Sequence, residues 1–254
     1  MGAEQPAKPI RIYTMGRFTL VRHGEPIRFS AKTKKPIELL KALLTYGGRE
    51  VNTAQLTDIL WPDAEGDTAH NVLGVTLHRL RTLLGIHDAI YLCDNKLALN
   101  PALCWVDAWE SERLLGKLDT LLKTKQPCAQ TLDTYTSEFF GLCKGAFLNG
   151  DMGNEVIVAR ERLQDKFLHT LDTIGLYWEQ NGDWAQAKAF YQKGLELNPM
   201  IESLYQRLMI CHREMGQRSE ALIVYRRCQD ALSTHLDIPP SRHTDAIRRT
   251  LITD

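Results

Sequence analysis

The sequence predicts a mainly α-helical protein with a small β component, in which short antiparallel strands and a helix-turn-helix precede an all-α helical repeat. Three observations lead to this fold class. Short β-favouring runs bounded by turn residues are confined to the first hundred residues. Within that part, a long amphipathic pattern follows a shorter one. From Asp107 onward the apolar spacing is helical, and two segments repeat at a distance of 34 positions.

The composition is that of a globular chain. The 254 residues are 44% hydrophobic and 24% charged, enough for real cores. There is no run of eighteen apolar residues and no apolar segment at the start, so we expect a cytoplasmic protein with no membrane contact. The net charge is zero but uneven: residues 1–100 hold 13 Lys and Arg against 10 Asp and Glu, and residues 101–254 hold 18 against 21. A net charge of zero argues against a nucleic-acid partner. The N-terminal part, however, is weakly basic, as a part that binds nucleic acid would be.

No pattern of residues indicates catalysis or a bound metal. The six cysteines are widely spaced, with no CxxC pair and no HxxxH partner, so reduced and mostly buried thiols are expected rather than a zinc site. We find no Ser/His/Asp order and no phosphate-binding loop of the form GxxxxGK[ST], and we therefore expect neither an enzyme nor a cofactor. Seven histidines belong to no recognisable constellation: His23, His70, His87, His169, His212, His235 and His243.

Three short strands are predicted near the N-terminus. Residues 1–9 hold two prolines and little apolar surface, so they are either a flexible leader or the mark of a truncation point. Three short strands need a helical layer over one face. The β-favouring runs, separated by turn residues, are Ile10 to Tyr13, Phe18 to Val21 and Ile27 to Phe29.

The first helix of that layer begins near Pro36, a residue suited to a first helical turn, and stops at Gly47-Gly48. Its buried stripe is Ile37, Leu40, Leu43 and Leu44. Three lysines stand close to its start: Lys32, Lys34 and Lys35. Cations are unfavourable at the positive end of a helix dipole, so these lysines form either a solvated loop or a grip on DNA phosphates, and we favour the grip.

Two further helices complete a helix-turn-helix. Asn52 or Thr53 caps a short helix that Pro62 ends, and a turn leads into a long helix over Thr68 to Leu84. The long helix buries a stripe formed by Leu73, Leu77, Leu80 and Leu84. Its opposite arc, at about 100° per residue, collects Thr68, Asn71, Val72, Val75, His78, Arg79 and Thr82.

This arc has the chemistry to read bases in a major groove. Arg bonds bidentately to guanine and Asn to adenine, while Val and Thr methyl groups pack on the thymine methyl group. From the segment alone, a core helix whose valines meet a neighbouring element is an equally good interpretation. The order of short helix, turn and long helix favours DNA reading, because the second helix of such a pair enters the groove.

A β-hairpin is predicted after Gly85. Ile90 to Cys93 and Lys96 to Leu99 flank Asp94-Asn95, two residues that tolerate positive φ. The hairpin would form a wing, and Asn95 and Lys96 at its tip either touch the flanking DNA backbone or minor groove or are an ordinary polar tip. Residues 101–106 then form a linker to a second domain.

The order of strands, three helices and wing, with LTDILWPDAEGDTAHNVLGVTLHRLRTLLG at its centre, resembles the OmpR-type winged helix of SARP-type bacterial regulators. The resemblance implies that residues 10–100 bind DNA, with the third helix in the major groove. Relatives often carry a pair of Arg or Lys where His78 precedes Arg79, so we expect a lower or pH-sensitive affinity. Arg81 projects toward the core side, where we expect it to pair with an acidic residue such as Asp58. The contacts implied are Asn71, Val72, Val75, His78 and Arg79.

The second half carries an internal repeat. A glycine, an alanine and a tyrosine each recur 34 positions later, which is the tetratricopeptide period. Small residues let paired helices approach, aromatic residues fill the groove between them, and stacked pairs form a concave face for a partner. The repeated residues are Gly182 with Gly216, Ala187 with Ala221 and Tyr191 with Tyr225.

Residues 107–252 resemble the bacterial transcriptional activator domain, the tetratricopeptide-like module that follows the winged helix in SARP-type regulators. The matching segments are VDAWESERLL, FFGLCKGAFL, ARERL, ESLYQRLM and YRRCQDALSTHLDIPPS. The resemblance implies a homodimer or side-by-side pair on double-stranded DNA, or contact with RNA polymerase or an upstream regulatory domain. Similar domain pairs also end very large regulators with an ATPase switch, so the chain is either a regulator by itself or the output part of a longer one. Five cations line a partner surface or, as we favour, a solvated helical face: Lys193, Arg207, Arg213, Arg226 and Arg227.

The sequence therefore predicts a sequence-specific DNA-binding transcriptional activator. The alternative is a protein-interaction scaffold, in which the repeats bind a peptide or domain and the winged helix has become a protein contact.

Overall fold

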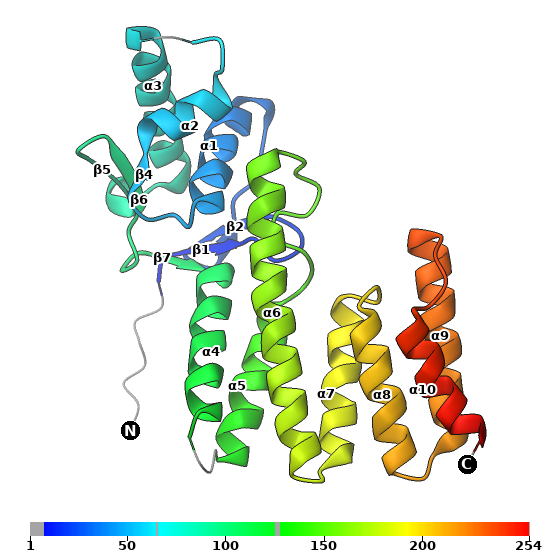
Figure 1. The fold of residues 1–254 in the computed structure, drawn as a ribbon. Helices are drawn as coiled ribbons and strands as arrows, with labels where there is room; N and C mark the ends of the chain where they lie inside the picture. The colour runs from blue at the N-terminus through cyan, green and yellow to red at the C-terminus, as the bar shows by residue number, and fades with distance from the viewer. Residues whose placement is uncertain (1–7, 65, 125–127, 254) are drawn as a thin grey trace. The chain divides into compact units, whose positions relative to one another are not determined.

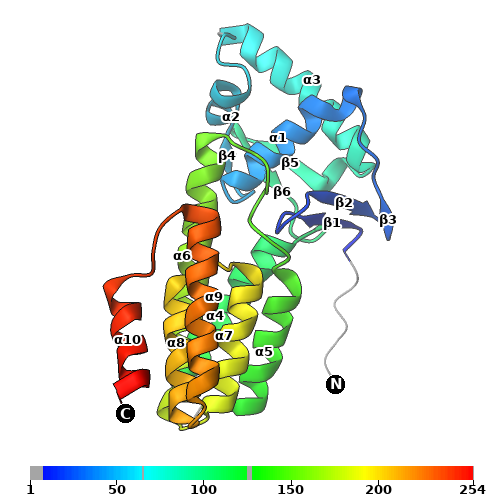
Figure 2. The same cartoon turned by 90° about the vertical axis from the view of Figure 1, so that its right-hand side faces the viewer.

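The structure, a computed structural model, describes residues 8–64, 66–124 and 128–253 and separates into two compact units (Figure 1, Figure 2). The N-terminal unit comprises Met1–Arg113 and Leu142–Gln164, and the C-terminal unit comprises Leu114–Gly141 and Asp165–Asp254. The predicted fold class is confirmed, because helices dominate and the described strands all lie within the first 106 residues. The predicted leader, residues 1–9, lies almost wholly outside the described residues. Within the described ranges, no helix is long and apolar enough to cross a membrane.

A four-stranded sheet in the order β3-β2-β1-β7 opens the N-terminal unit. β1 pairs antiparallel with β2 and parallel with β7, so that Ile12 lies opposite both Leu20 and Val106, and all three side chains are buried. The strands are β1 (Ile10–Tyr13), β2 (Thr19–Arg22), β3 (Glu25–Pro26) and β7 (Cys104–Val106).

Two predictions about this sheet are wrong. The third strand is Glu25–Pro26 rather than Ile27 to Phe29, because a tight turn with positive φ at His23 and Gly24 returns the chain to β2 at once. Residues 101–106 are not a plain linker, because their last three residues form β7, in which Cys104 and Val106 are buried.

The predicted helix-turn-helix and hairpin are confirmed. Asn52 caps α2 by accepting a 2.8 Å hydrogen bond from the amide of Ala54. Asp94 and Asn95 turn the hairpin with φ values of 49° and 56°, and β5 and β6 join β4 in a sheet of order β4-β6-β5. The elements are η1 (Ala31–Thr33), α1 (Lys34–Thr45), β4 (Val51–Asn52), α2 (Thr53–Leu60), α3 (Gly66–Leu84), η2 (His87–Ala89), β5 (Ile90–Cys93) and β6 (Lys96–Leu99).

Asp107 joins the end of β1 to the start of α4 (Asp107–Leu122). Asp107 is 1% exposed, and its carboxylate accepts hydrogen bonds from the amide of Thr14 at 2.8 Å, the hydroxyl of Thr14 at 2.6 Å and the amide of Met15 at 2.9 Å. Burial raises the pKa of Asp107, although these donors act in the opposite direction. The buried acid is therefore fully hydrogen-bonded, as a polar group in a core must be.

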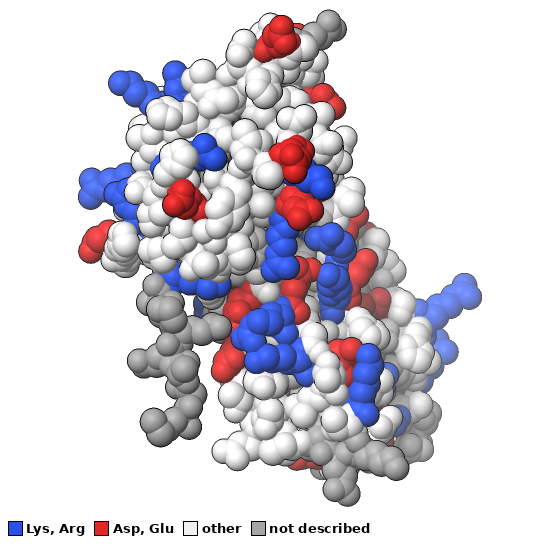
Figure 3. All heavy atoms as spheres, turned by 90° about the vertical axis from the view of Figure 1, so that its left-hand side faces the viewer, with Lys and Arg blue, Asp and Glu red and all other residues white. Residues whose placement is uncertain are grey.

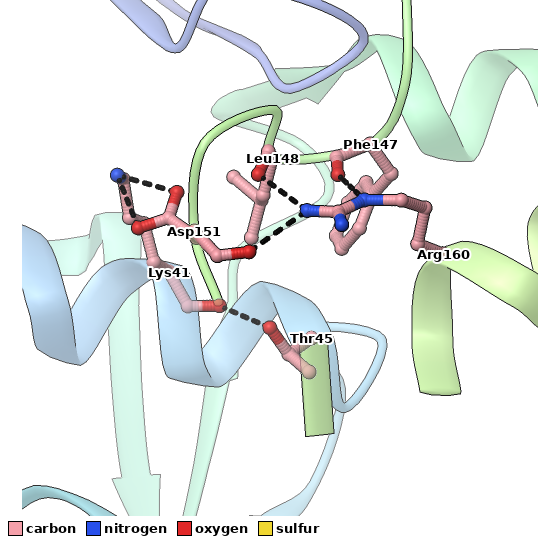
Figure 4. Close-up of polar contacts among 6 residues, drawn as sticks. All are labelled: Lys41, Thr45, Phe147, Leu148, Asp151 and Arg160. Atoms are coloured by element: carbon pink, nitrogen blue, oxygen red, sulfur yellow. Dashed lines mark hydrogen bonds and ion pairs between the residues drawn. The ribbon is translucent and has the colours of Figure 1, made fainter. Parts of the chain in front are cut away.

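Residues 142–164, which we call the strap, complete the N-terminal unit from a distant part of the chain. Phe147 and Leu148 are buried in its core, and the amide of Leu148 donates a 2.8 Å hydrogen bond to the carbonyl of Thr14. Lys41 of α1 forms an ion pair with Asp151 at 2.7 Å (Figure 4). The strap runs from the end of α5 (Ala129–Leu142) into α6 (Asn154–Gln180).

Within the strap, Arg160 of α6 holds the loop that precedes this helix in place. Its Nε donates to the carbonyl of Phe147, and its Nη2 donates to the carbonyls of Leu148 and Asp151, each at 2.9 Å (Figure 4). A single planar guanidinium thereby satisfies three loop carbonyls that have no place in a helix or sheet ladder.

The C-terminal unit stacks antiparallel helices, and its predicted 34-residue repeat is confirmed. Gly182 and Gly216 both have φ of 72° and make the turns before α7 and α9. Ala187, Ala221 and Tyr191 are fully buried between the helices. Figure 1 shows α7, α8 and α9 side by side. Their bounds are α7 (Trp184–Leu197), α8 (Glu202–Glu214), α9 (Arg218–Leu236) and α10 (Arg242–Thr253).

The last helix, α10, is fastened to α8 by Glu202. Its Oε1 accepts a 2.7 Å hydrogen bond from the amide of Ser241 and a second bond from the hydroxyl of Thr244. Burial raises the pKa of Glu202, but these hydrogen bonds outweigh it and hold that pKa below the usual value. The charged carboxylate thus stabilises the start of α10.

Candidate nucleic-acid interface

Helix α3 presents one buried side and one open side. Leu73, Leu77, Leu80 and Leu84 are at most 3% exposed, as the predicted stripe requires. Most of the predicted reading arc is exposed, while Val72 is half-buried. Val75 is 53% exposed, so the interpretation that both valines pack against a neighbouring element does not hold for this residue. The exposed members of the arc are Thr68, Asn71, Val75, His78, Arg79 and Thr82.

Arg81 takes a different partner from the one predicted. Its Nη2 donates a 2.9 Å hydrogen bond to the carbonyl of Ile90 in β5, rather than pairing with Asp58. The prediction that Arg81 lies away from the reading arc is consistent with this contact, but the partner was wrong because a backbone carbonyl cannot be identified from side-chain chemistry. Arg81 thereby links α3 to the wing.

The three lysines near α1 divide into two groups. Lys32 and Lys34 are exposed. Lys35 is also exposed but forms an ion pair with Glu38 at 2.9 Å and lies 5.7 Å from the centre of the Trp61 ring. Lys32 and Lys34 are therefore better placed to meet an external anion than Lys35.

The wing carries the two predicted tip residues and two side chains that sequence reasoning missed. Asn95 and Lys96 are exposed, and the ammonium of Lys96 lies 3.5 Å from the Glu50 carboxylate. In β5, Tyr91 and Leu92 are 47% and 44% exposed. The run IYLC has no alternation of polar and apolar residues, so its sequence could not indicate which side chains face outward.

Charged side chains of both signs are intermixed on one face of the molecule. On the face drawn in Figure 3, Lys and Arg stand among Asp and Glu and wide uncharged areas.

Beside the wing tip, a hydrogen bond with Asp94 raises the pKa of the exposed Cys93 thiol. In the part of the chain that the structure describes, no group of three His, Cys, Asp or Glu side chains is arranged to hold a metal.

Residues 106–252, more than half of the sequence, match the family described as the bacterial transcriptional activator domain. The chain belongs to this family. The family is described as a domain of bacterial transcriptional activators, and a winged helix followed by this domain is the organisation of SARP-type regulators. No curated protein matches the sequence.

Two solved structures are similar to the chain. Mycobacterium tuberculosis EmbR, solved in complex with a low-affinity phosphopeptide, has a TM-score of 0.66 and 18% identity and is matched over 96% of this chain and 65% of that chain. At this identity the likeness shows the fold alone, and this chain spans less than two thirds of the EmbR chain. A thermophilic TPR protein from Thermus thermophilus has a TM-score of 0.28 and 15% identity over 86% of this chain and 98% of that chain, which is too low to support an argument.

Three of the five cations considered for a partner surface contact other side chains of the activator domain. Lys193 lies 5.7 Å from the centre of the Phe140 ring, and Arg207 lies 3.3 Å from the buried carboxylate of Glu179. Arg213 pairs with its neighbour Glu214 at 2.9 Å. The two remaining cations, Arg226 and Arg227, are exposed.

Proposed function

We propose that the chain is a sequence-specific DNA-binding transcriptional activator, acting in the cytoplasm with α3 in the major groove and the wing alongside. The observation that carries the proposal is the exposed arc of α3 opposite its leucine stripe. In this arc Arg79 is suited to guanine and Asn71 to adenine, while the exposed Val75 offers methyl groups to thymine. His78 and the half-buried Val72 flank these readers.

Contacts with the DNA backbone would set the register of α3. Lys32 and Lys34 are the proposed phosphate contacts at the start of α1, and Asn95 and Lys96 are those of the wing. Lys35 contributes less, because its ammonium already pairs with Glu38. Lys96 can exchange its 3.5 Å partner Glu50 for a phosphate, since both side chains are more than half exposed.

The proposal assigns DNA binding to residues 10–100, with the strap as their support, and partner contact to the rest of residues 107–252. Two copies would bind side by side on repeated sites, and the helical repeats would contact the second copy, RNA polymerase or a further regulatory domain. Stacked helix pairs provide the extended surface that such contacts need.

A scaffold function is the second candidate, and the exposed apolar side chains favour it. Val75, Tyr91 and Leu92 are each more than 40% exposed on α3 and the wing. Apolar patches of this kind also serve protein partners. The scaffold would bind a peptide or domain and show no salt-dependent affinity for DNA.

The test begins with selection of bound fragments from a genomic DNA library at two salt concentrations. A recurrent motif, with affinity falling steeply as salt rises, supports the activator. Recovery of random sequence alone at both salt concentrations supports the scaffold.

Three variants then separate the roles on the selected site and on random DNA. Arg79→Ala should weaken binding to the selected site by about 1–3 kcal/mol and leave random DNA nearly unaffected. Lys34→Ala should weaken both alike and reduce the salt slope by about one. Arg226→Ala, an exposed arginine of the activator domain, is the matched control. Equal losses on both DNAs for Arg79→Ala would remove its base-reading role.

A further inference from the structure

Gly74 occupies the ninth position of the 19-residue helix α3 and has no packing reason to be glycine. Glycine in a helix interior is destabilising relative to alanine, because it loses more conformational freedom on folding. A Cβ atom added at Gly74 would meet no other atom within 4 Å. The folded chain therefore bears the cost of this glycine without any gain in its own packing.

Other helical glycines show what a packing reason looks like. A Cβ atom at the buried Gly175 would lie 2.1 Å from the hydroxyl of Tyr191, so only glycine fits there. At Gly116 of α4 and Gly141 of α5, as at Gly74, an added Cβ atom would meet no atom within 4 Å, and we call such positions open. An open position alone therefore does not indicate a function. Gly74 differs from the other two open glycines because it stands on the helix proposed to enter DNA.

On α3, Gly74 lies at the flank of the reading arc. At about 100° per residue it is about 40° from His78, about 60° from Asn71 and about 100° from Val75. His70 and His78, both exposed, lie one turn before and one turn after it. At Gly74 the surface of the helix is therefore bare backbone between these two positions, and we call this gap the notch.

The proposed base-contacting residues next to Gly74 require the helix to approach the DNA closely. Asn71 and Val75 have short side chains, so they reach base edges only when the helix axis lies deep in the groove. A helix with its side chains is about 10–12 Å across, and the major groove is about 12 Å wide. The flanks of the helix therefore meet the sugar–phosphate walls, and a notch on one flank lets that wall come closer.

We propose that Gly74 is the point at which α3 and one sugar–phosphate wall of the major groove come into direct contact. This inference rests on the proposed DNA-binding function. The notch sets the depth at which Asn71 and Val75 read bases, and it allows His70 and His78 to approach phosphates on either side. Gly74 is in these terms a positioning residue, because it acts through its neighbours.

The test uses the full chain and the site recovered by selection. Gly74→Ala fills the notch with one methyl group, and Gly74→Gln fills it with a longer, uncharged and helix-favouring side chain. Gly116→Ala and Gly141→Ala are the matched controls. Thermal unfolding and affinity for the selected site are measured for each variant.

Gly74→Ala and Gly116→Ala should raise the unfolding midpoint, because both positions are open and lie inside a helix, whereas Gly141 is the second-last residue of α5 and its variant should change the midpoint less. Only the Gly74 variants should bind DNA more weakly, by about fivefold for alanine and by more for glutamine. If Gly74→Gln binds as tightly as the controls while Arg79→Ala loses affinity, the notch has no role and the inference fails alone. If the unaltered chain shows no salt-dependent binding to DNA, the proposed function itself fails, and the inference with it.

Discussion

Arg160→Ala should destabilise the N-terminal unit by about 2–4 kcal/mol. The guanidinium donates three hydrogen bonds of 2.9 Å to the carbonyls of Phe147, Leu148 and Asp151. Hydrogen bonds from a charged donor contribute about 1.5–3 kcal/mol each, but bonds to one side chain are not additive. The half-buried position of Arg160 lowers the sum further, because water can reach the freed carbonyls. Arg160→Lys should recover less than half of the loss, because one ammonium cannot span three carbonyls.

The assay for Arg160 combines urea unfolding with hydrogen exchange. Two amides report on the strap directly: that of Gly16, bonded to the carbonyl of Ala146 at 2.9 Å, and that of Leu148, bonded to Thr14. Both should lose protection in Arg160→Ala. Arg162→Ala, an arginine two positions further on, is the control and should stay within about 0.5 kcal/mol of wild type. Wild-type protection of both amides in Arg160→Ala would refute the reasoning.

Three further predictions concern other parts of the chain. Gly175→Ala should destabilise the C-terminal unit by about 1–3 kcal/mol, because the new methyl group displaces the Tyr191 ring; a raised melting temperature would contradict this. Since the folded pKa of Glu202 lies below its ordinary 4.5, the carboxylate stabilises the fold above that pH and loses its effect as pH falls through the folded pKa. The difference in melting temperature between wild type and Glu202→Gln should therefore shrink from pH 6 to pH 3, and a constant difference would exclude the linkage. Hydrogen bonds from the first turn of α5 lower the pKa of Cys128, whereas the pKa of Cys93 is raised, so iodoacetamide at pH 8 should label Cys128 first, as measured by mass spectrometry.

Local periodicity was sufficient to predict the elements that form α3 and the wing. The leucine spacing in α3 defines one side of the helix, and that side is buried as expected. The pair Asp94-Asn95 carries its turn preference in its own residues, so the hairpin bounds were predictable. The exposure of Asn71, Val75 and Arg79 follows from the same spacing, because residues opposite a core stripe must face away from it.

Pairings between distant segments were not predictable. Strand β7 has three residues, and its partner β1 lies more than ninety positions earlier, so no local pattern marks it. Phe147 and Leu148 belong to a loop between two helices, and their burial in the N-terminal core depends on backbone contacts with Thr14 and Gly16. The partner of Arg81 escaped prediction for the same reason, because it is a carbonyl supplied by the folded wing.

The strap limits how regulators of this kind can exchange their winged helices by gene rearrangement. The family match begins at residue 106, yet residues 142–164 lie within the N-terminal unit. A gene rearrangement that joins a foreign winged helix at that boundary would leave a strap shaped for another core. Lys41 would face an unfamiliar loop in place of Asp151, and Phe147 would enter an unfamiliar cavity. Viable hybrids should therefore inherit the strap together with its winged helix, as two separated stretches of one gene.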